Sequence, residues 1–158
     1  MLKNEKGYSA LDIGTGSGYL TKILEKSFSL VIGTDINYDV LKNQTYKTQN
    51  LICCNSADAL AIQFDLIICN LPYLATEGII DIATDGGKEG LEIPLPMIKS
   101  AISCIKPGGK FLFVTSSLSN YSKLIESCSQ DGLETKILAK KKLFFEELII
   151  VEVKKLLS

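Results

Sequence analysis

Histidine and arginine are both absent from the 158-residue sequence. A chain without an imidazole cannot use histidine as a general base, a proton shuttle or a metal ligand. All 17 of its basic residues are lysines, so it lacks the two-pronged contact by which arginine recognises guanine and grips phosphate. These absences exclude histidine-dependent catalysis and weigh against a dedicated reader of nucleic-acid sequence, although lysine still binds phosphate as a point charge.

Long apolar runs are absent as well. The sequence contains no run of about 18 apolar residues, the length needed to cross a membrane. Its first residues also lack the apolar core of a signal peptide. A net charge of −1 and a hydrophobic content of 46% are typical of a compact globular protein. We therefore expect a cytoplasmic protein with no membrane segment, folded as one domain over residues 1–158.

Cysteine pairs with metal-binding spacing are missing too. The five cysteines are Cys53, Cys54, Cys69, Cys104 and Cys128. They include no Cys-x-x-Cys pair, and no histidine is present to complete a mixed zinc site. We interpret them as small buried hydrophobic side chains in a reducing compartment, and we expect no metal.

Short apolar runs that are typical of buried strands alternate along the chain with segments of helical periodicity. Strands are predicted at 8–13, 30–34, 51–54, 66–69, 111–115, 133–139 and 147–153. Helices are predicted after Gly18, at 38–47 behind an Asn37 cap, at 94–105, and after a Ser119 cap. Residues 75–92 are predicted to form a long functional loop or lid, and the three lysines at 140–142 a solvated turn.

The alternation of strand and helix predicts a mostly parallel sheet with right-handed crossovers. No helix separates the last two strands, so they are expected to pair antiparallel. The predicted fold is an α/β, three-layer Rossmann-like sandwich. Its seven-stranded sheet is mostly parallel and contains one antiparallel strand near the C-terminus.

The first predicted strand runs into a glycine loop, Asp12-Ile13-Gly14-Thr15-Gly16-Ser17-Gly18. Asp35 ends the second strand, where a carboxylate can accept both ribose hydroxyls of an adenosine. The glycine spacing differs from the dinucleotide pattern Gly-x-Gly-x-x-Gly, and Asp12 would repel a pyrophosphate at the following helix N-terminus. An acid in that place suits a cation such as an amino group. A small molecule with an adenosine at one end and an ammonium group at the other is S-adenosylmethionine.

These residues resemble the motifs of the class I, Rossmann-like methyltransferases, and the resemblance covers nearly the whole chain. It implies S-adenosylmethionine as the cofactor. In the pattern of this family Asp35 binds the ribose, Ile36 packs on the adenine and Asp58 meets the adenine edge, although a helix cap or loop acid is an open alternative for Asp58. The implied cofactor-binding residues are Asp12, Gly14, Thr15, Gly16, Gly18, Asp35, Ile36, Asp58, Ala59 and Asn70.

The fourth predicted strand stops at the corner Asn70-Leu71-Pro72-Tyr73, because Pro72 lacks a backbone donor and fixes φ. The corner resembles the Asn-Pro-Pro-Tyr motif of methyltransferases that modify a planar NH₂ nitrogen, with Leu71 in place of the first proline. The resemblance implies that these four residues are catalytic. The Asn70 side-chain oxygen and the Leu71 carbonyl would accept the two N–H groups, and Tyr73 would stack on the flat group. No strong base is needed, because positioning supplies most of the effect.

The segment after the corner, Asp85-Gly86-Gly87-Lys88-Glu89-Gly90-Leu91, resembles the Gly-Gly-x-x-Gly segment of HemK-type enzymes. These enzymes methylate the glutamine of the Gly-Gly-Gln loop in translation release factors. Together with the absence of arginine, the segment favours a protein glutamine amide over a nucleic-acid amine. The compact form is similar to the archaeal and eukaryotic branch, whose members work with a small zinc-binding activator protein. The resemblance therefore implies a release factor as substrate and such a protein as partner.

Two alternatives stay open at this point. The same corner is found in enzymes that methylate adenine or guanine amines in RNA or DNA. Relatives also carry a segment before the first strand that covers the cofactor, and few residues precede that strand in this sequence. Either a partner or the loop around Gly86 closes the site, or the chain is an inactive binding subunit with a methyltransferase fold.

Overall fold

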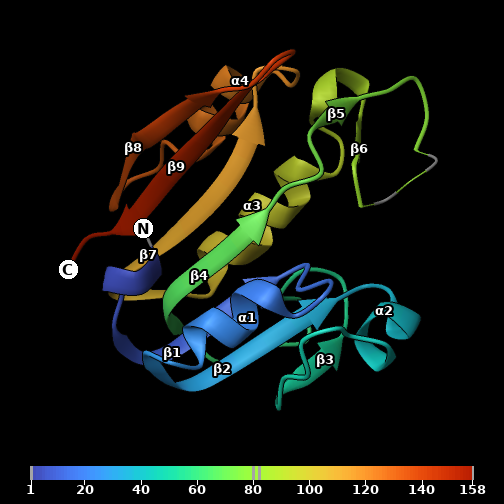
Figure 1. The fold of residues 1–158 in the computed structure, drawn as a ribbon. Coiled ribbons are helices and arrows are strands. Elements are labelled where there is room, and N and C mark those ends of the chain that lie inside the picture. The colour runs from blue at the N-terminus through green and yellow to red at the C-terminus, as the bar shows by residue number, and fades with distance from the viewer. Residues whose placement is uncertain (1, 80, 82, 158) are drawn as a thin grey trace.

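A twisted sheet of seven strands runs through the molecule, with the strand order β3-β2-β1-β4-β7-β9-β8 (Figure 1). The computed structural model describes residues 2–79, 81 and 83–157. The strands of this sheet are β1 (Gly7–Ile13), β2 (Phe28–Asp35), β3 (Leu51–Cys53), β4 (Phe64–Asn70), β7 (Ile105–Ser116), β8 (Leu133–Lys142) and β9 (Glu147–Lys155). A second, two-stranded sheet pairs β5 (Leu74–Ala75) with β6 (Asp85–Gly87).

Five neighbouring strands, from β3 to β7, are parallel, as the alternation of strand and helix predicts. Strand β9 is antiparallel to both of its neighbours, β7 and β8. It is therefore the one antiparallel strand of the sheet, and the prediction of a mostly parallel, seven-stranded sheet is confirmed.

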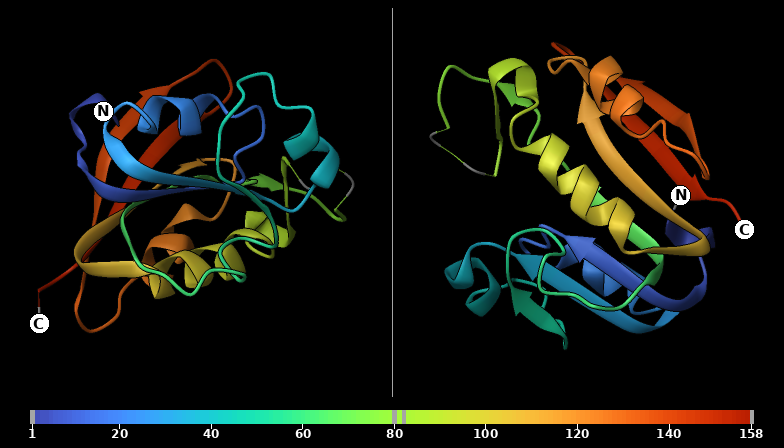
Figure 2. Two further views of the ribbon diagram at one scale, coloured as in Figure 1. Left: turned by 90° about the horizontal axis from the view of Figure 1, so that it is seen from below. Right: turned by 180° about the vertical axis from the view of Figure 1, so that it is seen from behind.

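Helices cover both faces of the sheet and make the three layers (Figure 2). The helical elements are η1 (Leu2–Asn4), α1 (Tyr19–Leu24), α2 (Tyr38–Lys42), η2 (Lys88–Gly90), α3 (Pro94–Ser103) and α4 (Tyr121–Ser127). Helix α1 lies on one face, and α3 and α4 lie on the other. No helix in the described ranges is long and apolar enough to cross a membrane.

Strand β4 shows how the sheet joins two cores. Leu66 and Ile68 pack in a cluster on the α1 side, whereas Ile67 and Cys69 pack in a larger cluster on the side of α3 and α4. Because successive strand side chains point to opposite faces, an uninterrupted apolar run is what a strand covered on both sides requires. The apolar run that ends at Asn70 is thus the central strand of the fold.

Helix α2 ends earlier than the sequence predicts. It begins behind Asn37, whose side-chain oxygen accepts the N–H groups of Asp39 and Val40 as predicted for a cap, but it stops at Lys42 instead of continuing to residue 47. The chain turns away because Gln44 and Tyr46 bond to the glycine loop: the Gln44 amide donates to the Gly16 carbonyl, and the Tyr46 N–H donates to the Ser17 carbonyl.

Three other local predictions are wrong. Lys140–Lys142 form the end of β8 rather than a turn, because they pair with β9, and the turn lies at Leu143–Glu146. Ser119 does not cap α4, since its hydroxyl bonds to Thr115 and to the Ser116 carbonyl, and Asn120 takes the cap position. Among the cysteines, Cys69, Cys104 and Cys128 are buried, but Cys53 is exposed and Cys54 half-buried.

Candidate active site

Three parallel strands bring the ends of the sequence motifs together. Ile13 pairs with Thr34 of β2 on one side and with Cys69 of β4 on the other. The residues that follow these three therefore emerge side by side at the carboxyl edge of the sheet, where ligands bind in open α/β folds. A cavity of about 480 Å³ opens there, lined by Ile13, Gly14, Gly16, Asp35, Ile36, Asn37, Val40, Asn55, Ser56, Asn70, Pro72, Asp81, Ala83, Ile93 and Met97.

The glycine loop forms the floor of this cavity at its β1 end. Gly14 and Gly16 both have positive φ, at 70° and 50°, a backbone conformation that residues other than glycine rarely adopt. A Cβ atom at Gly14 would meet no atom within 4 Å in the described part of the chain, so this backbone faces open space. The loop can therefore let a ligand come close to its main chain.

Asp35 links the glycine loop to the start of α2. One of its carboxylate oxygens accepts the N–H of Gly16 at 3.0 Å, and the other accepts the N–H of Asn37 at 2.9 Å. Each oxygen keeps a further lone pair, and the side chain is only partly buried and lines the cavity. Asp35 thus stands ready to accept hydroxyl groups of a ligand.

Asp12 lies beneath the glycine loop, and its side chain is not among those that line the cavity. It is 2% exposed, and it accepts a hydrogen bond from the Thr21 hydroxyl at 2.6 Å. Burial raises the pKa of its carboxyl from the ordinary 3.8 to about 6, against the lowering effect of the Thr21 and Thr15 hydroxyls. Thr15 also bonds to Thr21, so the two hydroxyls and Asp12 form one buried cluster that fixes the loop to α1.

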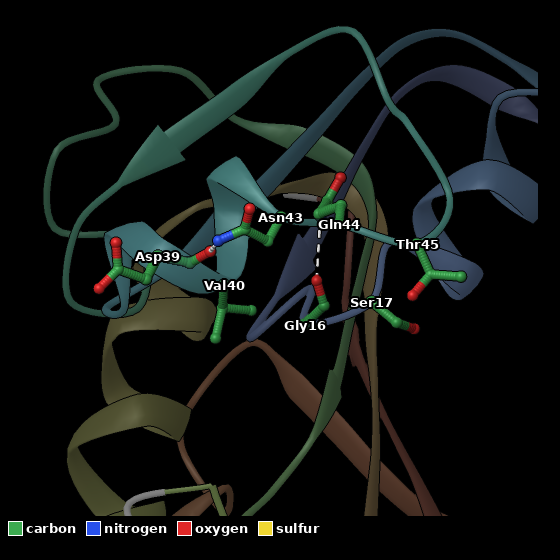
Figure 3. Close-up of a pocket in the computed structure, with 7 residues that line it drawn as sticks. All are labelled: Gly16, Ser17, Asp39, Val40, Asn43, Gln44 and Thr45. Carbon is green, nitrogen blue, oxygen red and sulfur yellow. Dashed lines mark hydrogen bonds between the residues drawn. The ribbon is translucent and has the colours of Figure 1, made fainter.

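A second hollow lies on the outer side of the glycine loop, between the loop and α2 (Figure 3). Gln44 is 3% exposed there and reaches the Gly16 carbonyl at 3.2 Å and the Thr15 hydroxyl at 3.4 Å. Its amide oxygen accepts the Thr48 hydroxyl at 2.9 Å. Gly18 must stay small, because a Cβ atom would come within 2.3 Å of the Tyr46 carbonyl. Gly18 and Thr15 therefore shape the loop rather than line the cavity.

The far wall of the cavity differs in part from the sequence prediction. Ile36 is 51% exposed and lines the cavity, as an apolar contact for an adenine requires. Asp58 and Ala59 do not line it, and the Asp58 carboxylate instead accepts the Ser100 hydroxyl of α3 at 2.7 Å. Asn55 and Ser56, which no sequence motif singles out, occupy that wall. Ser56 has a φ of 52°, a conformation for which the sequence carries no signal.

The remaining residues that line the cavity come from the lid segment, residues 75–92, and from the start of α3. Asp81 and Ala83 belong to the segment 75–92, and Ile93 and Met97 lie four residues apart, around the start of α3. Residues four apart share a helix face, which explains why both side chains reach the cavity. The predicted lid thus supplies part of the wall and is partly structured by β5, β6 and η2.

The corner Asn70–Tyr73 stands where β4 leaves the sheet. Asn70 is exposed and lines the cavity together with Pro72. Leu71 is 1% exposed, and its N–H donates to the Val114 carbonyl of β7 at 3.1 Å. At this position the Asn-Pro-Pro-Tyr motif has a proline, which would restrict the corner by fixing φ. In this chain the buried side chain of Leu71 anchors the corner instead. Tyr73 is partly buried beside Glu146, and burial together with this carboxylate raises the pKa of the Tyr73 hydroxyl.

The glycines of the segment 85–91 lie directly against the backbone of the corner. A Cβ atom at Gly86 would come within 2.6 Å of the Pro72 carbonyl oxygen, and one at Gly90 within 2.5 Å of the Tyr73 carbonyl oxygen. Gly90 also has a φ of 67°. The glycine segment is thus a support on which the corner rests, and side chains at these two positions would push it out of place.

The described residues that line the cavity include no cysteine. Cys69 precedes Asn70 but is 3% exposed and points into the core. Burial, with a smaller effect of the Asp12 charge, raises the pKa of its thiol far above the usual range. The groups that reach the cavity near the corner are instead hydrogen-bond acceptors and donors without a strong base, which suits positioning chemistry.

These features fit S-adenosylmethionine. The cavity joins the carboxylate of Asp35, which could accept ribose hydroxyls, the exposed apolar side chain of Ile36, on which an adenine could pack, and the side-chain-free backbone of Gly14 and Gly16. Asn70, the first residue of the corner, lines the same cavity. The cavity thus has the groups that an adenosine needs, with room for a further group beside the glycine loop, but Asp12, which the sequence predicts to meet the ammonium group, lies outside its lining.

Comparison with known proteins agrees with this assignment. The sequence family described as "Methyltransferase domain" matches residues 4–148. A Methanocaldococcus jannaschii protein, whose name gives protein N5-glutamine methyltransferase as a provisional assignment, is 32% identical over 167 residues, covering 96% of this chain and 85% of the relative. The release factor glutamine methyltransferase of Caulobacter vibrioides is 27% identical over 170 residues, covering 93% of this chain and 58% of that enzyme.

A solved structure has the same fold. The Mtq2–Trm112 complex of E. cuniculi, described as responsible for methylation of the translation termination factor eRF1, matches with a TM-score of 0.82 over 96% of this chain and 87% of that chain. The sequences are 22% identical, so this match establishes the fold alone. The family match, the first relative and the cofactor-shaped cavity agree: the chain belongs to the methyltransferase-domain family and is a class I, S-adenosylmethionine-dependent methyltransferase that resembles the HemK-type enzymes.

Proposed function

We propose that this methyltransferase modifies the side-chain amide of a protein glutamine, and that its substrate is a translation release factor. The observation that carries the proposal is the corner Asn70–Tyr73, of which Asn70 and Pro72 line the cofactor cavity and which rests on the glycine segment 85–91. An exposed amide, a backbone carbonyl and an aromatic ring beside a methyl-donor cavity suit a flat NH₂ group.

The chemistry of an amide nitrogen explains this choice of residues. Its lone pair is delocalised into the neighbouring carbonyl, so the nitrogen is a poor nucleophile. The Asn70 side-chain oxygen and the Leu71 carbonyl oxygen would each accept one N–H group, which orients the nitrogen and favours a tetrahedral geometry. Tyr73 would stack on the planar amide and fix its plane.

The rest of the site needs to hold the reactants in line. When S-adenosylmethionine is bound, its sulfonium would supply an activated methyl group and leave as a neutral thioether. The methylated nitrogen, made acidic by its positive charge, would release its extra proton to water, so the protein needs no strong base. Asp35 would hold the ribose, Ile36 would contact the adenine, and Asn70 would contact both cofactor and substrate. Correct alignment of two bound reactants accounts for most of the rate gain that such a site can give.

The relatives support the release factor as substrate. The Caulobacter vibrioides enzyme is named for that activity, and the solved complex is described as acting on a termination factor. The second of these is a complex with Trm112, which supports a small activator protein as the partner of this chain, and we expect that partner to bind zinc. A substrate that works on the ribosome would place the enzyme in the cytoplasm.

A methyl-transfer assay with labelled cofactor tests the proposal. Purified release factor, tRNA and ribosomal RNA are offered separately, with and without the candidate activator protein. We expect label on the release factor alone, and mass spectrometry should locate it on the glutamine of the Gly-Gly-Gln loop. Label on RNA only would instead identify a nucleic-acid amine methyltransferase, and cofactor binding without any transfer would favour an inactive binding subunit.

A further inference from the structure

Two phenylalanine side chains stand in solvent at the turn between β8 and β9. Phe144 is 95% exposed and Phe145 87% exposed, and their rings contact edge to face with centroids 4.9 Å apart. The turn is closed by the Leu143 N–H, which donates to the Glu146 carbonyl at 2.7 Å. We call residues 143–146 the aromatic tip. Two adjacent aromatic rings on a closed turn, fully outside the core, indicate a contact surface for another molecule.

The aromatic tip is tied to the active site. Glu146, its last residue, contacts the Tyr73 hydroxyl and accepts the Ser116 hydroxyl at the end of β7. The next residue, Glu147, exchanges two hydrogen bonds with Ser117. Because β7 pairs with β4 up to Asn70, these bonds hold the tip at the same edge of the sheet as the corner. The tip and the β5–β6 segment lie at the same end of the molecule (Figure 1).

The charges beside the aromatic tip indicate the kind of surface it fits. Lys140, Lys141 and Lys142 precede the tip, and all three are exposed. Lys140 pairs with Glu147 at 3.2 Å, and Glu146 is engaged by Ser116 and Tyr73. The two acidic residues beside the tip, Glu146 and Glu147, are therefore occupied, whereas Lys141 and Lys142 carry no ion pair within the described ranges. A partner surface with an apolar pocket and flanking acidic groups would complement the tip.

We propose that the aromatic tip docks the substrate protein beside the amide that is methylated. This proposal rests on the proposed function, since it assumes a protein substrate. Phe144 and Phe145 insert into an apolar pocket on the substrate surface, away from the modified loop itself. Lys141 and Lys142 meet acidic groups around that pocket. The Glu146–Tyr73 contact then couples the docked position of the substrate to the corner that receives the amide.

The test is the double variant Phe144→Ser/Phe145→Ser, assayed for methylation of full-length release factor, with the activator protein present if the wild type needs it. We expect KM for the release factor to rise by about tenfold or more, as for loss of central aromatic contacts in an interface. The rate at saturating release factor should stay near that of the wild type, because a docking contact acts on binding rather than on the chemical step. The affinity for S-adenosylmethionine should not change.

Two control variants sharpen the result. Leu157→Ser removes another exposed apolar side chain, which is 80% exposed. Leu157 follows the C-terminal end of β9, and because β9 is antiparallel to β7, it lies at the end of the sheet away from the active site. It should leave KM unchanged. Phe144→Leu/Phe145→Leu keeps apolar bulk without aromatic rings and should retain much of the affinity for a protein pocket.

The possible contrary outcomes are distinct. If the wild type methylates release factor and the serine variant does so with the same KM, the docking proposal fails while the proposed function stands. If the wild type does not methylate release factor, both fail. If the serine variant loses binding to RNA or to the activator protein with an unchanged KM for release factor, the tip is the contact for that molecule and the substrate-docking proposal is wrong.

Discussion

Asn70 ends the central strand with an exposed amide that lines the cavity, and a first prediction follows from its place. Asn70→Ala removes an acceptor from the point where the substrate nitrogen would develop charge. We expect kcat to fall by about 10²- to 10³-fold, the usual loss for one preorganised polar group at a reacting centre. Cofactor affinity, measured by calorimetry, should change little.

Asn55→Ala is the matched control for this prediction. Asn55 is also an exposed asparagine that lines the same cavity, but it comes from the loop after β3. Its loss should weaken cofactor binding while kcat at saturating cofactor is retained. Equal kcat values for Asn70→Ala and the wild type would remove the corner from the mechanism.

Asp12 gives a second prediction, on pH. Burial raises its pKa in the folded protein to about 6, above the ordinary 3.8, so the folded state binds this proton more tightly than the unfolded state. The contribution of Asp12 to stability is therefore fully present below pH 3.8 and is lost as the pH rises through about 6. From pH 4 to above 7 the loss amounts to about 2–3 kcal/mol.

The variant Asp12→Asn isolates this effect, because an amide does not titrate. Other carboxylates behave in the opposite way, since Lys106 and the backbone N–H of Ser9 lower the pKa of Asp65 against its own desolvation. We therefore expect the difference in unfolding free energy between variant and wild type, from urea titrations, to shift in favour of the variant by about 2–3 kcal/mol between pH 4 and above pH 7. A difference that does not vary with pH would contradict a raised pKa at Asp12.

At the scale of elements, the glycine segment 85–91 is the support of the corner, and a third prediction tests it. Gly90→Ala would place a Cβ atom 2.5 Å from the Tyr73 carbonyl oxygen at a φ of 67°. We expect the strained backbone to lower stability by about 1–3 kcal/mol. Displacement of Tyr73 should lower kcat roughly tenfold or more, because small misplacements at a reacting centre are costly.

Gly78→Ala is the control, since Gly78 lies in the same loop, carries no positive φ, and a Cβ atom there would meet no atom of the described residues within 4 Å. It should leave both stability and kcat near wild-type values. Cofactor affinity should be unchanged in both variants. If Gly90→Ala and Gly78→Ala behave alike, the segment does not support the corner.

The elements also show what the sequence can and cannot predict. Most strands of the large sheet were predictable because they contain apolar runs bounded by polar residues, and their parallel orientation followed from the intervening helices; β5 and β6 contain no such run and were not predicted. The end of α2 was not, because it depends on Gln44 reaching the Gly16 carbonyl, a contact between positions 28 residues apart. Lys140–Lys142 have the composition of a turn, but pairing with β9 extends the strand through them.

At the scale of the whole molecule, the cavity was predictable only in outline. Motifs at strand ends, such as Asp35 and Asn70, could be placed because parallel strands share a carboxyl edge. Asn55, Ser56 and Asp81 could not be found, since loop conformations and the fold of the lid bring them to the cavity. Asp58 shows the reverse case, because its sequence position suits the adenine but its carboxylate bonds to Ser100 of α3.

The cavity draws together the ends of β1, β2 and β4, the lid segment and α3, so a ligand there should stabilise the whole fold, which is a fourth prediction. A ligand at 100 times its Kd that binds only the folded state adds about 2.7 kcal/mol. For a chain of this length we expect S-adenosylmethionine to raise Tm by roughly 5–10 °C. Differential scanning calorimetry would measure the shift.

For the variant Asp35→Ala, the Tm with cofactor is compared with the Tm of the same variant without cofactor, so that the loss of the bonds to Gly16 and Asn37 affects both values equally. This variant should show almost no increase in Tm on addition of S-adenosylmethionine. Asn70→Ala should retain most of the shift, since its defect is expected in methyl transfer. An equal shift in Asp35→Ala and the wild type would mean that the cofactor binds elsewhere.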